Sequence, residues 1–261
     1  MDVATIISNS FKFPLRNLKK LPLLFILFIL LAIIPIGKLM NNDFVVYFGA
    51  FAFVMFLLIV PGYLLSIIKT GSKESSMFPS FNLMNNIYDS IRVLALRFVY
   101  MIVPAVVFFI LLSTLGPASV ENLYEFRIHY FLAGVGLMIV IFLAIYLIFE
   151  FLLFFAKARL AYFNSLSEAL KVNKVIGDIR NIGVITILKW LIVMVVLFIV
   201  ISVVSSVVMA IPYVGFLIYI CIIIPTIESI GNYSLGLLYS NIERNSTDLD
   251  RIGQETKLIR H

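Results

Sequence analysis

Charged and polar side chains inside long apolar runs are the residues best placed to do chemistry in this chain. Glu150, Lys189 and Glu228 each stand within such a run, and Asn232 and Gly236 follow Glu228 at successive helical turns. A charged side chain at the centre of a membrane helix costs about 2.5–3.5 kcal/mol, so it faces protein or water rather than lipid. We therefore take Glu150, Lys189, Glu228 and Asn232 as the candidate intramembrane polar site.

Two interpretations of this site stay open. In the first, Glu228 is the titrating group of a proton or ion site. In the second, the residues form a packing network in which Lys189 neutralises a carboxylate and Glu150 extends toward the membrane surface. Glu150 and Lys189 lie about 10–12 Å from the ends of their predicted helices at 1.5 Å per residue. Because these depths match, we expect Lys189 to pair with Glu150 first and with Glu228 second.

Enzyme and metal motifs do not account for the polar residues. The chain has one cysteine, Cys221, and two histidines, His129 and His261. A Cys/His metal site needs several ligands at characteristic spacing. His-Glu-x-x-His, Gly-x-Ser-x-Gly and Walker sequences do not occur in the sequence. We expect no enzymatic activity, no cofactor, no bound metal and no nucleic-acid partner.

The composition indicates which solvent surrounds the elements that carry these residues. Hydrophobic residues make up 62% of the 261 positions and charged residues 13%. Soluble domains have roughly 45–50% apolar and about 25% charged residues. The mean hydropathy of +1.09 agrees with this difference. The chain is predicted to be an integral membrane protein, and its first partner is the lipid bilayer.

Six apolar stretches are long enough to cross that bilayer as helices, which takes about 20 residues each. They cover residues 21–40, 44–68, 93–115, 130–156, 182–211 and 214–239. The sequence predicts an all-α fold, a polytopic transmembrane helical bundle with six spanning helices over residues 21–239. Residues 1–20 form a basic amphipathic interfacial segment, and residues 240–261 form a cytoplasmic tail.

The basic residues predict the orientation of the bundle. All of them except Lys38, Arg127 and Lys189 fall on one side of the predicted spans. Such a bias marks the cytoplasmic side of a membrane protein. We expect a multi-pass protein of the cell membrane with both termini in the cytoplasm, as an even number of spans requires.

Amphipathic helices are predicted on the same cytoplasmic side. Residues 3–20 place apolar side chains on one face and four basic residues on the other: Lys12, Arg16, Lys19 and Lys20. These four either bind anionic lipid headgroups, at about 1 kcal/mol each, or are ordinary positive-inside charge. A capping box from Ser165 to Glu168 predicts a helix over residues 165–176, and residues 81–91 predict a third interfacial helix.

One segment resembles a known family signature. It comprises Pro61-Gly62-Tyr63-Leu64-Leu65-Ser66-Ile67-Ile68-Lys69, then Gly71 and Phe78-Pro79-Ser80-Phe81-Asn82. It is similar to the signature of the DUF4013 family, whose members are mostly archaeal multi-pass membrane proteins of unknown function. The resemblance implies an α-helical multi-pass fold in a prokaryotic cytoplasmic membrane, and it transfers no catalytic residue.

Two functions fit these expectations. The first is a structural or accessory membrane component that interacts with lipids or partner proteins. The second is a small-solute or ion transporter or channel with a polar site around Glu228, Lys189 and Glu150. A cavity that reaches Glu228 would favour transport, whereas a fully packed bundle would favour the structural component.

Overall fold

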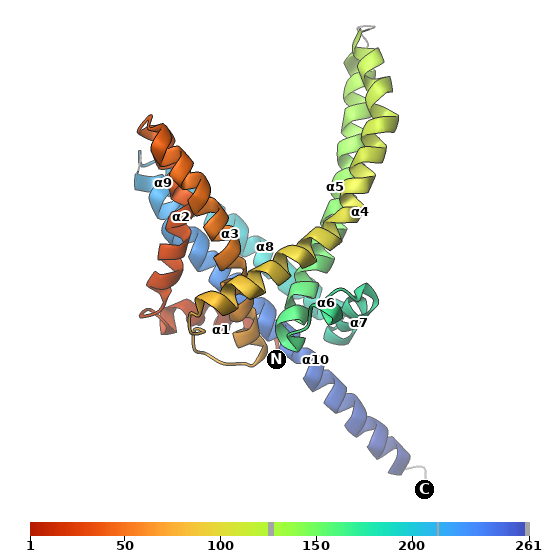
Figure 1. Cartoon of the computed structure of the whole chain (residues 1–261). Helices are drawn as coiled ribbons and strands as arrows, with labels where there is room; N and C mark the ends of the chain where they lie inside the picture. The colour runs from red at the N-terminus through yellow and green to blue at the C-terminus, as the bar shows by residue number, and fades with distance from the viewer. Residues whose placement is uncertain (125–127, 213, 259–261) are drawn as a thin grey trace.

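The computed structural model of the chain consists of helices joined by short turns (Figure 1). It describes the backbone of residues 1–124, 128–212 and 214–258, and the side chains of residues 1–115, 132–212 and 214–242. The helices are α1 (Val3–Arg16), α2 (Leu21–Leu39), α3 (Asp43–Ser72), α4 (Leu83–Tyr124), α5 (Ile128–Phe163), α6 (Leu166–Ala169), α7 (Val172–Ile182), α8 (Val184–Met209), α9 (Val214–Ile218) and α10 (Ile224–Leu258).

The all-α class and the six predicted spans are confirmed. Within the described residues, six helices are long and apolar enough to cross a membrane: Leu21–Leu39, Asp43–Ser72, Leu83–Leu115, Leu132–Phe163, Val184–Met209 and Val214–Ile242. Large hydrophobic side chains are exposed along each of them. Because water would penalise this surface and lipid does not, the chain is a multi-pass membrane protein in contact with the bilayer.

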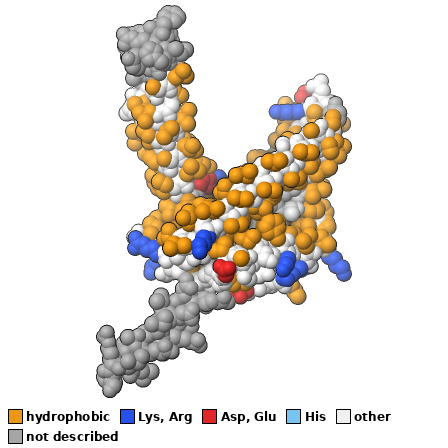
Figure 2. All heavy atoms as spheres, turned by 180° about the vertical axis from the view of Figure 1, so that it is seen from behind, with side chains coloured by type: hydrophobic (Ala, Val, Ile, Leu, Met, Phe, Trp, Pro, Cys, Tyr) orange, Lys and Arg blue, Asp and Glu red, His pale blue; other side chains and the backbone are white. Residues whose placement is uncertain are grey.

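The six spans form two arms that diverge like a V (Figure 1). One arm is the hairpin of α4 and α5, and the other contains α2, α3 and α9. Contacts are most extensive between α4 and α5 and between α2 and α3. Hydrophobic side chains cover both arms, whereas most of the Lys and Arg side chains in view lie in a band below them (Figure 2).

Glycine allows α3 and α10 to cross closely near that band. A Cβ atom on Gly236 would lie 2.2 Å from the carbonyl oxygen of Ile68, and one on Gly71 would lie 2.4 Å from that of Tyr233. Only residues without a side chain permit this backbone approach, which is a common device for packing helices in membranes. The crossing fixes the half of α10 that follows Asn232.

The last span is irregular where it begins. Residues Tyr219–Ile223 form a π-helical turn between α9 and α10. Pro225 is the second residue after it, and because proline has no N–H group it removes a backbone donor to that turn. A π-helical turn widens the helix locally and is frequent at functional sites. Glu228 lies one turn after Pro225.

Helix α1 packs on the protein through one face, but the predicted apolar face is only partly correct, because Phe11 is exposed. Phe13 stacks on Tyr233 with ring centroids 3.9 Å apart and on Phe78 with centroids 4.6 Å apart. The amino group of Met1 donates to Oδ1 of Asn241 at 2.5 Å. The amphipathic helix therefore has a protein partner on one face.

Three predicted boundaries differ from the structure. Residues 81–91 do not form a separate helix, because α4 runs unbroken from Leu83 and has no Gly or Pro to interrupt it before Pro104. Helix α5 continues past residue 156 to Phe163, again with no breaker in between. Helix α10 continues through residue 239 to Leu258, and the side chains of the tail from residue 243 onward lie outside the described set.

The helix predicted over residues 165–176 is divided into α6 and α7. Ser165 caps α6 as predicted, since its Oγ accepts from the backbone N–H of Glu168 at 3.4 Å. The carbonyl oxygen of Glu168 then accepts from Nε of Arg159 at 2.9 Å, and that of Ala169 accepts from the hydroxyl of Tyr100 at 3.0 Å. These carbonyls are the ones that would continue a single helix, so the tertiary contacts end it after one turn.

Candidate functional site: charged residues inside the bundle

The structure brings two of the four predicted site residues into direct contact. Nδ2 of Asn232 donates to Oε2 of Glu228 at 2.9 Å and to the carbonyl oxygen of Glu228 at 2.7 Å. Both residues lie on α10 at the four-residue spacing that puts them on one face. The amide therefore holds the carboxylate of Glu228 against the helix and leaves its other oxygen free to face outward.

Glu150 has a partner that the sequence did not indicate. Its Oε1 accepts from Nη2 of Arg97 at 2.7 Å and from the hydroxyl of Tyr146 at 2.9 Å. The pair joins α4 to α5, and the Arg97 side chain is 51% exposed while that of Glu150 is 26% exposed. A charged pair this open needs water or a polar partner beside it.

The predicted pairing of Lys189 with Glu150 is wrong. Lys189 is exposed on α8, and no ion pair of Lys189 occurs among the described side chains. Its neighbour Trp190 is the residue that points inward, where Nε1 donates to Oγ of Ser234 at 3.2 Å. Adjacent helix positions are rotated by about 100°, so packing of the tryptophan turns Lys189 outward.

Lys157, rather than Lys189, is the lysine that lies near the carboxylates of the candidate site. It lies on α5, half-buried, within electrostatic range of Glu228, Glu150 and Arg97. The prediction put Lys157 outside the span because it ended the helix at residue 156. A usable signal was present, since Glu150 and Lys157 are seven residues apart and so lie on one helix face.

Three cavities meet at Glu228. One of about 380 Å³ lies among α2, α3, α4, α5 and α10 and is also lined by Arg97, Lys157 and Asn232. A second of about 390 Å³ lies among α5, α8 and α10 and is also lined by Lys157 and Asn232. The third, of about 710 Å³, lies between α8 and α10. Glu228 is thus reached from both sides of the contact between α5 and α10.

The largest of these three cavities contains an unsatisfied polar group. Ser205 is 6% exposed, and its Oγ has no hydrogen-bond partner among the described residues. Ser202, Ser206 and Tyr219 line the same cavity as Ser205 and Glu228. A buried hydroxyl without a partner costs free energy, so water or a solute in this cavity would complete its hydrogen bonding.

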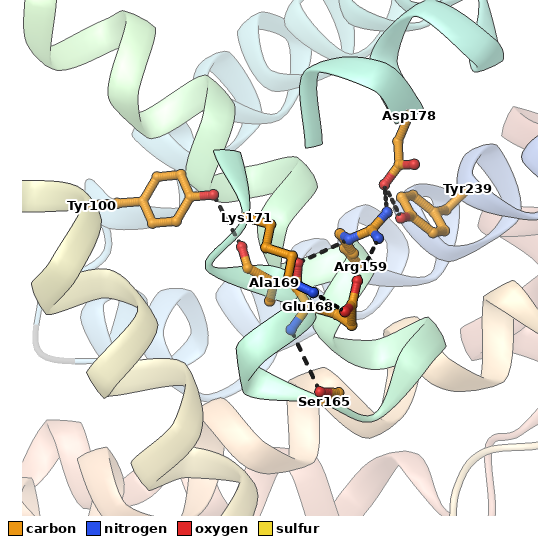
Figure 3. Close-up of polar contacts among 8 residues, drawn as sticks. All are labelled: Tyr100, Arg159, Ser165, Glu168, Ala169, Lys171, Asp178 and Tyr239. Atoms are coloured by element: carbon orange, nitrogen blue, oxygen red, sulfur yellow. Dashed lines mark hydrogen bonds and ion pairs between the residues drawn. The ribbon is translucent and has the colours of Figure 1, made fainter. Parts of the chain in front are cut away.

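A second charged cluster, built from α5, α6, α7 and α10, has its charges paired with one another (Figure 3). Arg159 donates through Nη1 to Oδ2 of Asp178 at 2.5 Å and through Nη2 to Oε2 of Glu168 at 2.9 Å. The hydroxyl of Tyr239 donates to the same oxygen of Asp178 at 2.5 Å. The Arg159 side chain is 6% exposed, and its guanidinium group also lies over the ring of Phe163. We call Arg159, Glu168, Asp178 and Tyr239 the arginine cluster.

The arginine cluster anchors α6 and α7 rather than forming a reactive centre. Glu168 also accepts from Nζ of Lys171, and this bond, followed by the one from Arg159, lowers the pKa of the Glu168 carboxyl. Each charge in the cluster has a charged partner of opposite sign. The sequence indicated Glu168 only as part of a capping box, because nothing local shows that Arg159 turns toward Glu168 and Asp178.

The described side chains do not assemble a metal site. Nowhere in residues 1–115, 132–212 and 214–242 do three or more His, Cys, Asp or Glu side chains come together as a metal ion would require.

The signature segment serves packing. The N–H group of Gly62 donates to Oγ of Ser90 at 2.7 Å, and a Cβ atom on Gly62 would lie 2.0 Å from the carbonyl oxygen of Asn86. Tyr63 is fully buried, and Phe78 is the outer ring of the stack on Phe13. The signature therefore holds α3 against α4 and fixes the connection between them.

Comparison with known proteins agrees with this description. A family model described as "Protein of unknown function (DUF4013)" matches residues 45–213, which include α4, α5, α8 and most of α3. No curated protein and no solved structure matches the chain. Because the match covers more than half of the chain, and the signature segment within it has a defined packing role, this six-span membrane protein belongs to the DUF4013 family.

Proposed function

We propose that the protein is a transporter or channel for a small solute or ion and that Glu228 contacts the moving species. The observation that carries the proposal is the meeting of three cavities at Glu228. A packing network would instead enclose the carboxylate, as the arginine cluster encloses Asp178. Charged side chains within membrane spans commonly mark substrate and ion pathways.

The roles of the residues follow from their positions. Glu228 binds a cation, a proton or a donor group of a solute, while Asn232 keeps its carboxylate oriented. Lys157 lines two of the cavities on opposite sides of the contact between α5 and α10 and competes with the solute for Glu228. Arg97 lines the first cavity, and its open ion pair with Glu150 supplies charge that holds water beside it.

Access of water to the site is the first test. In a Cys221→Ala background, Asn232→Cys and Met194→Cys should react with a membrane-impermeant thiol reagent, because both positions line a cavity. Val196→Cys, which is exposed on α8, should stay unreactive in the bilayer. Equal protection of all three cysteines would mean that the cavities are dry, and the proposal would fail.

Transport itself is measured in proteoliposomes. Protons are followed with an internal pH-sensitive dye, and rubidium is followed as a tracer, each driven by an imposed membrane potential. Flux should exceed that of empty liposomes and should fall in Glu228→Gln but not in Lys189→Met, a charge change on the outer face of α8. Flux that is unchanged by Glu228→Gln would show that Glu228 is not on the path.

A lipid-interacting accessory component is the second candidate, and α1 favours it. Phe11 and Leu15 on α1 and Leu18 just after it are exposed, and so are the four basic residues of this segment: Lys12, Arg16, Lys19 and Lys20. Apolar side chains beside cations are typical of helices that bind anionic membrane surfaces. Anionic nanodiscs should stabilise the wild type more than a variant in which these four residues are glutamine.

We also propose that both termini face the cytoplasm. Because Met1 donates a hydrogen bond to Asn241, the start of α1 and the middle of α10 lie at the same end of the bundle. The bias of basic residues toward that end supports the cytoplasmic side. Cysteine at position 4 in the Cys221→Ala background should resist an impermeant reagent in intact cells, and labelling there would reverse the orientation.

A further inference from the structure

A separate polar cavity of about 680 Å³ lies between the end of α3 and the start of α4. The connection between these helices and Asn164, from the turn after α5, complete its wall. Its charged side chains are the cations Lys69, Lys73 and Arg92 and the single acid Asp89. The cavity therefore carries an excess of positive charge and favours an anion.

Asn86 supplies an unsatisfied donor in the wall of this cavity. The residue is 2% exposed, and its Nδ2 has no hydrogen-bond partner within the part of the chain that the structure describes. A buried N–H group that is not bonded costs about 1–3 kcal/mol. Asn86 also lines the cavity, so an acceptor atom that reached its amide would remove this penalty.

Arg92 is held in place before any ligand arrives. Its Nη1 donates to Oδ1 of Asp89 at 2.9 Å and to Oδ1 of Asn164 at 3.1 Å, and its guanidinium group lies over the ring of Tyr88. Because the side chain is 8% exposed and fixed from three sides, it loses little rotational freedom when an anion binds.

The start of α4 borders the cavity. Oδ1 of Asn82 accepts from the backbone N–H of Asn85 at 3.1 Å, so this N–H group is already bonded. The positive end of the helix dipole lies at the same place and favours an anion. The helix dipole and the cations of the cavity thus favour the same kind of ligand.

We propose that this cavity binds a phosphate group. Phosphate offers several acceptor oxygens and up to two negative charges, which suit two lysines, an arginine and an unbonded amide together. The cavity is larger than inorganic phosphate, so the rest of a phosphate ester fits beside it. The group belongs either to a lipid headgroup or to a soluble phosphate compound. This site is separate from Glu228 and does not depend on transport.

The test compares anions on the purified full-length protein in a neutral detergent. Melting temperature is measured against inorganic phosphate, glycerol phosphate and short-chain phosphatidic acid, with chloride at matched ionic strength as the reference. At least one phosphate compound should raise the melting temperature in a concentration-dependent way, as expected for a ligand of the folded state. Stabilisation by the soluble compounds identifies a free phosphate, and stabilisation by phosphatidic acid alone identifies a lipid headgroup.

Variants connect the effect to the cavity. Lys69→Met/Lys73→Met should weaken binding by about tenfold or more, as loss of a charge-assisted hydrogen bond does. Asn86→Ala should weaken it too, in a protein that folds normally without ligand. Lys174→Met/Arg180→Met removes the same charge from α7, where both side chains are exposed and neither lines the cavity, and should bind as the wild type does. The proposal is overturned if no phosphate compound stabilises the wild type, or if the α7 variant and the cavity variant lose the effect equally.

Discussion

The arginine cluster and the surroundings of Glu228 both include charged or polar residues of α5 and α10, yet they differ in how their charges are satisfied. Arg159 bonds to two carboxylates and lies in a packed region without an adjoining cavity among those described (Figure 3). Glu228 bonds to Asn232, and three cavities adjoin it. Charges with complete partners stabilise the fold, whereas charges with incomplete partners remain able to bind something else.

The position of α8 produces this difference. Near its start, Trp190 packs on Phe154 with ring centroids 5.6 Å apart and bonds to Ser234, so α8 touches the bundle there. Beyond Phe198 it lies away from α10, and the space between them is the cavity of about 710 Å³. The tight crossing at Gly236 lies on the packed side of Glu228, and the π-helical turn lies on the open side.

The largest expected effect of a substitution is in the arginine cluster. Arg159→Met leaves Asp178 buried without its cation, and loss of one partner from a buried ion pair costs about 3–5 kcal/mol. The free energy of unfolding is measured by denaturant titration in detergent. Arg180→Met removes an exposed arginine from α7 and should change stability little. A loss below about 1 kcal/mol for Arg159→Met would contradict the stabilising role of the cluster.

A glycine pair on α10 tests the same contrast without charges. Gly236→Ala forces a Cβ atom into the backbone of α3 and should cost about 1–3 kcal/mol, as overpacking does. Gly231→Ala is the matched control, because a Cβ atom there would lie 3.9 Å from Cε of Met194, an ordinary contact. Equal losses in both variants would mean that the region around Glu228 is as tightly packed as the crossing.

Neutralising the charges around Glu228 should affect stability less. Glu228→Gln and Lys157→Met should each cost about 1 kcal/mol or less if water in the cavities hydrates the remaining charge, as it does for exposed pairs. The same denaturant titration gives these values, and the double variant gives the coupling between the two residues. A cost close to that of Arg159→Met would place Glu228 in a dry, paired environment.

The smallest expected effect is a pH dependence at the rim of the arginine cluster. Lys171 and Arg159 lower the pKa of Glu168, so the ionised carboxylate stabilises the folded state. This contribution is fully present above the pKa that Glu168 has in the unfolded chain, about 4.3, and is lost as the pH falls through its lower pKa in the folded state. Melting temperatures of the wild type and Glu168→Gln should therefore differ above that range and converge in acid. If the difference in melting temperature between the two proteins does not vary with pH, the contribution of Glu168 comes from hydrogen bonding and not from its charge.

Apolar runs of about 20 residues were sufficient to predict what the bilayer imposes on this chain. Lipid requires each crossing segment to satisfy its own backbone, so the number of spans and their approximate bounds follow from composition and length. The cap of α6 at Ser165 and the spacing of Glu228 and Asn232 follow from helix geometry, because these contacts join residues three or four positions apart.

Pairing between helices was decided by the tertiary structure. We expected Lys189 to pair with Glu150 because the two residues lie at similar depths in their predicted helices. Depth gives no information on how a helix is rotated about its axis. In the structure, packing of Trp190 turns Lys189 outward. The partners found instead, Arg97 for Glu150 and Lys157 near Glu228, depend on which faces of α4, α5 and α10 meet. The cavities at Glu228 and around Asn86 arise from imperfect packing of distant segments. No periodicity within one segment encodes that packing, because it is a property of the assembled bundle.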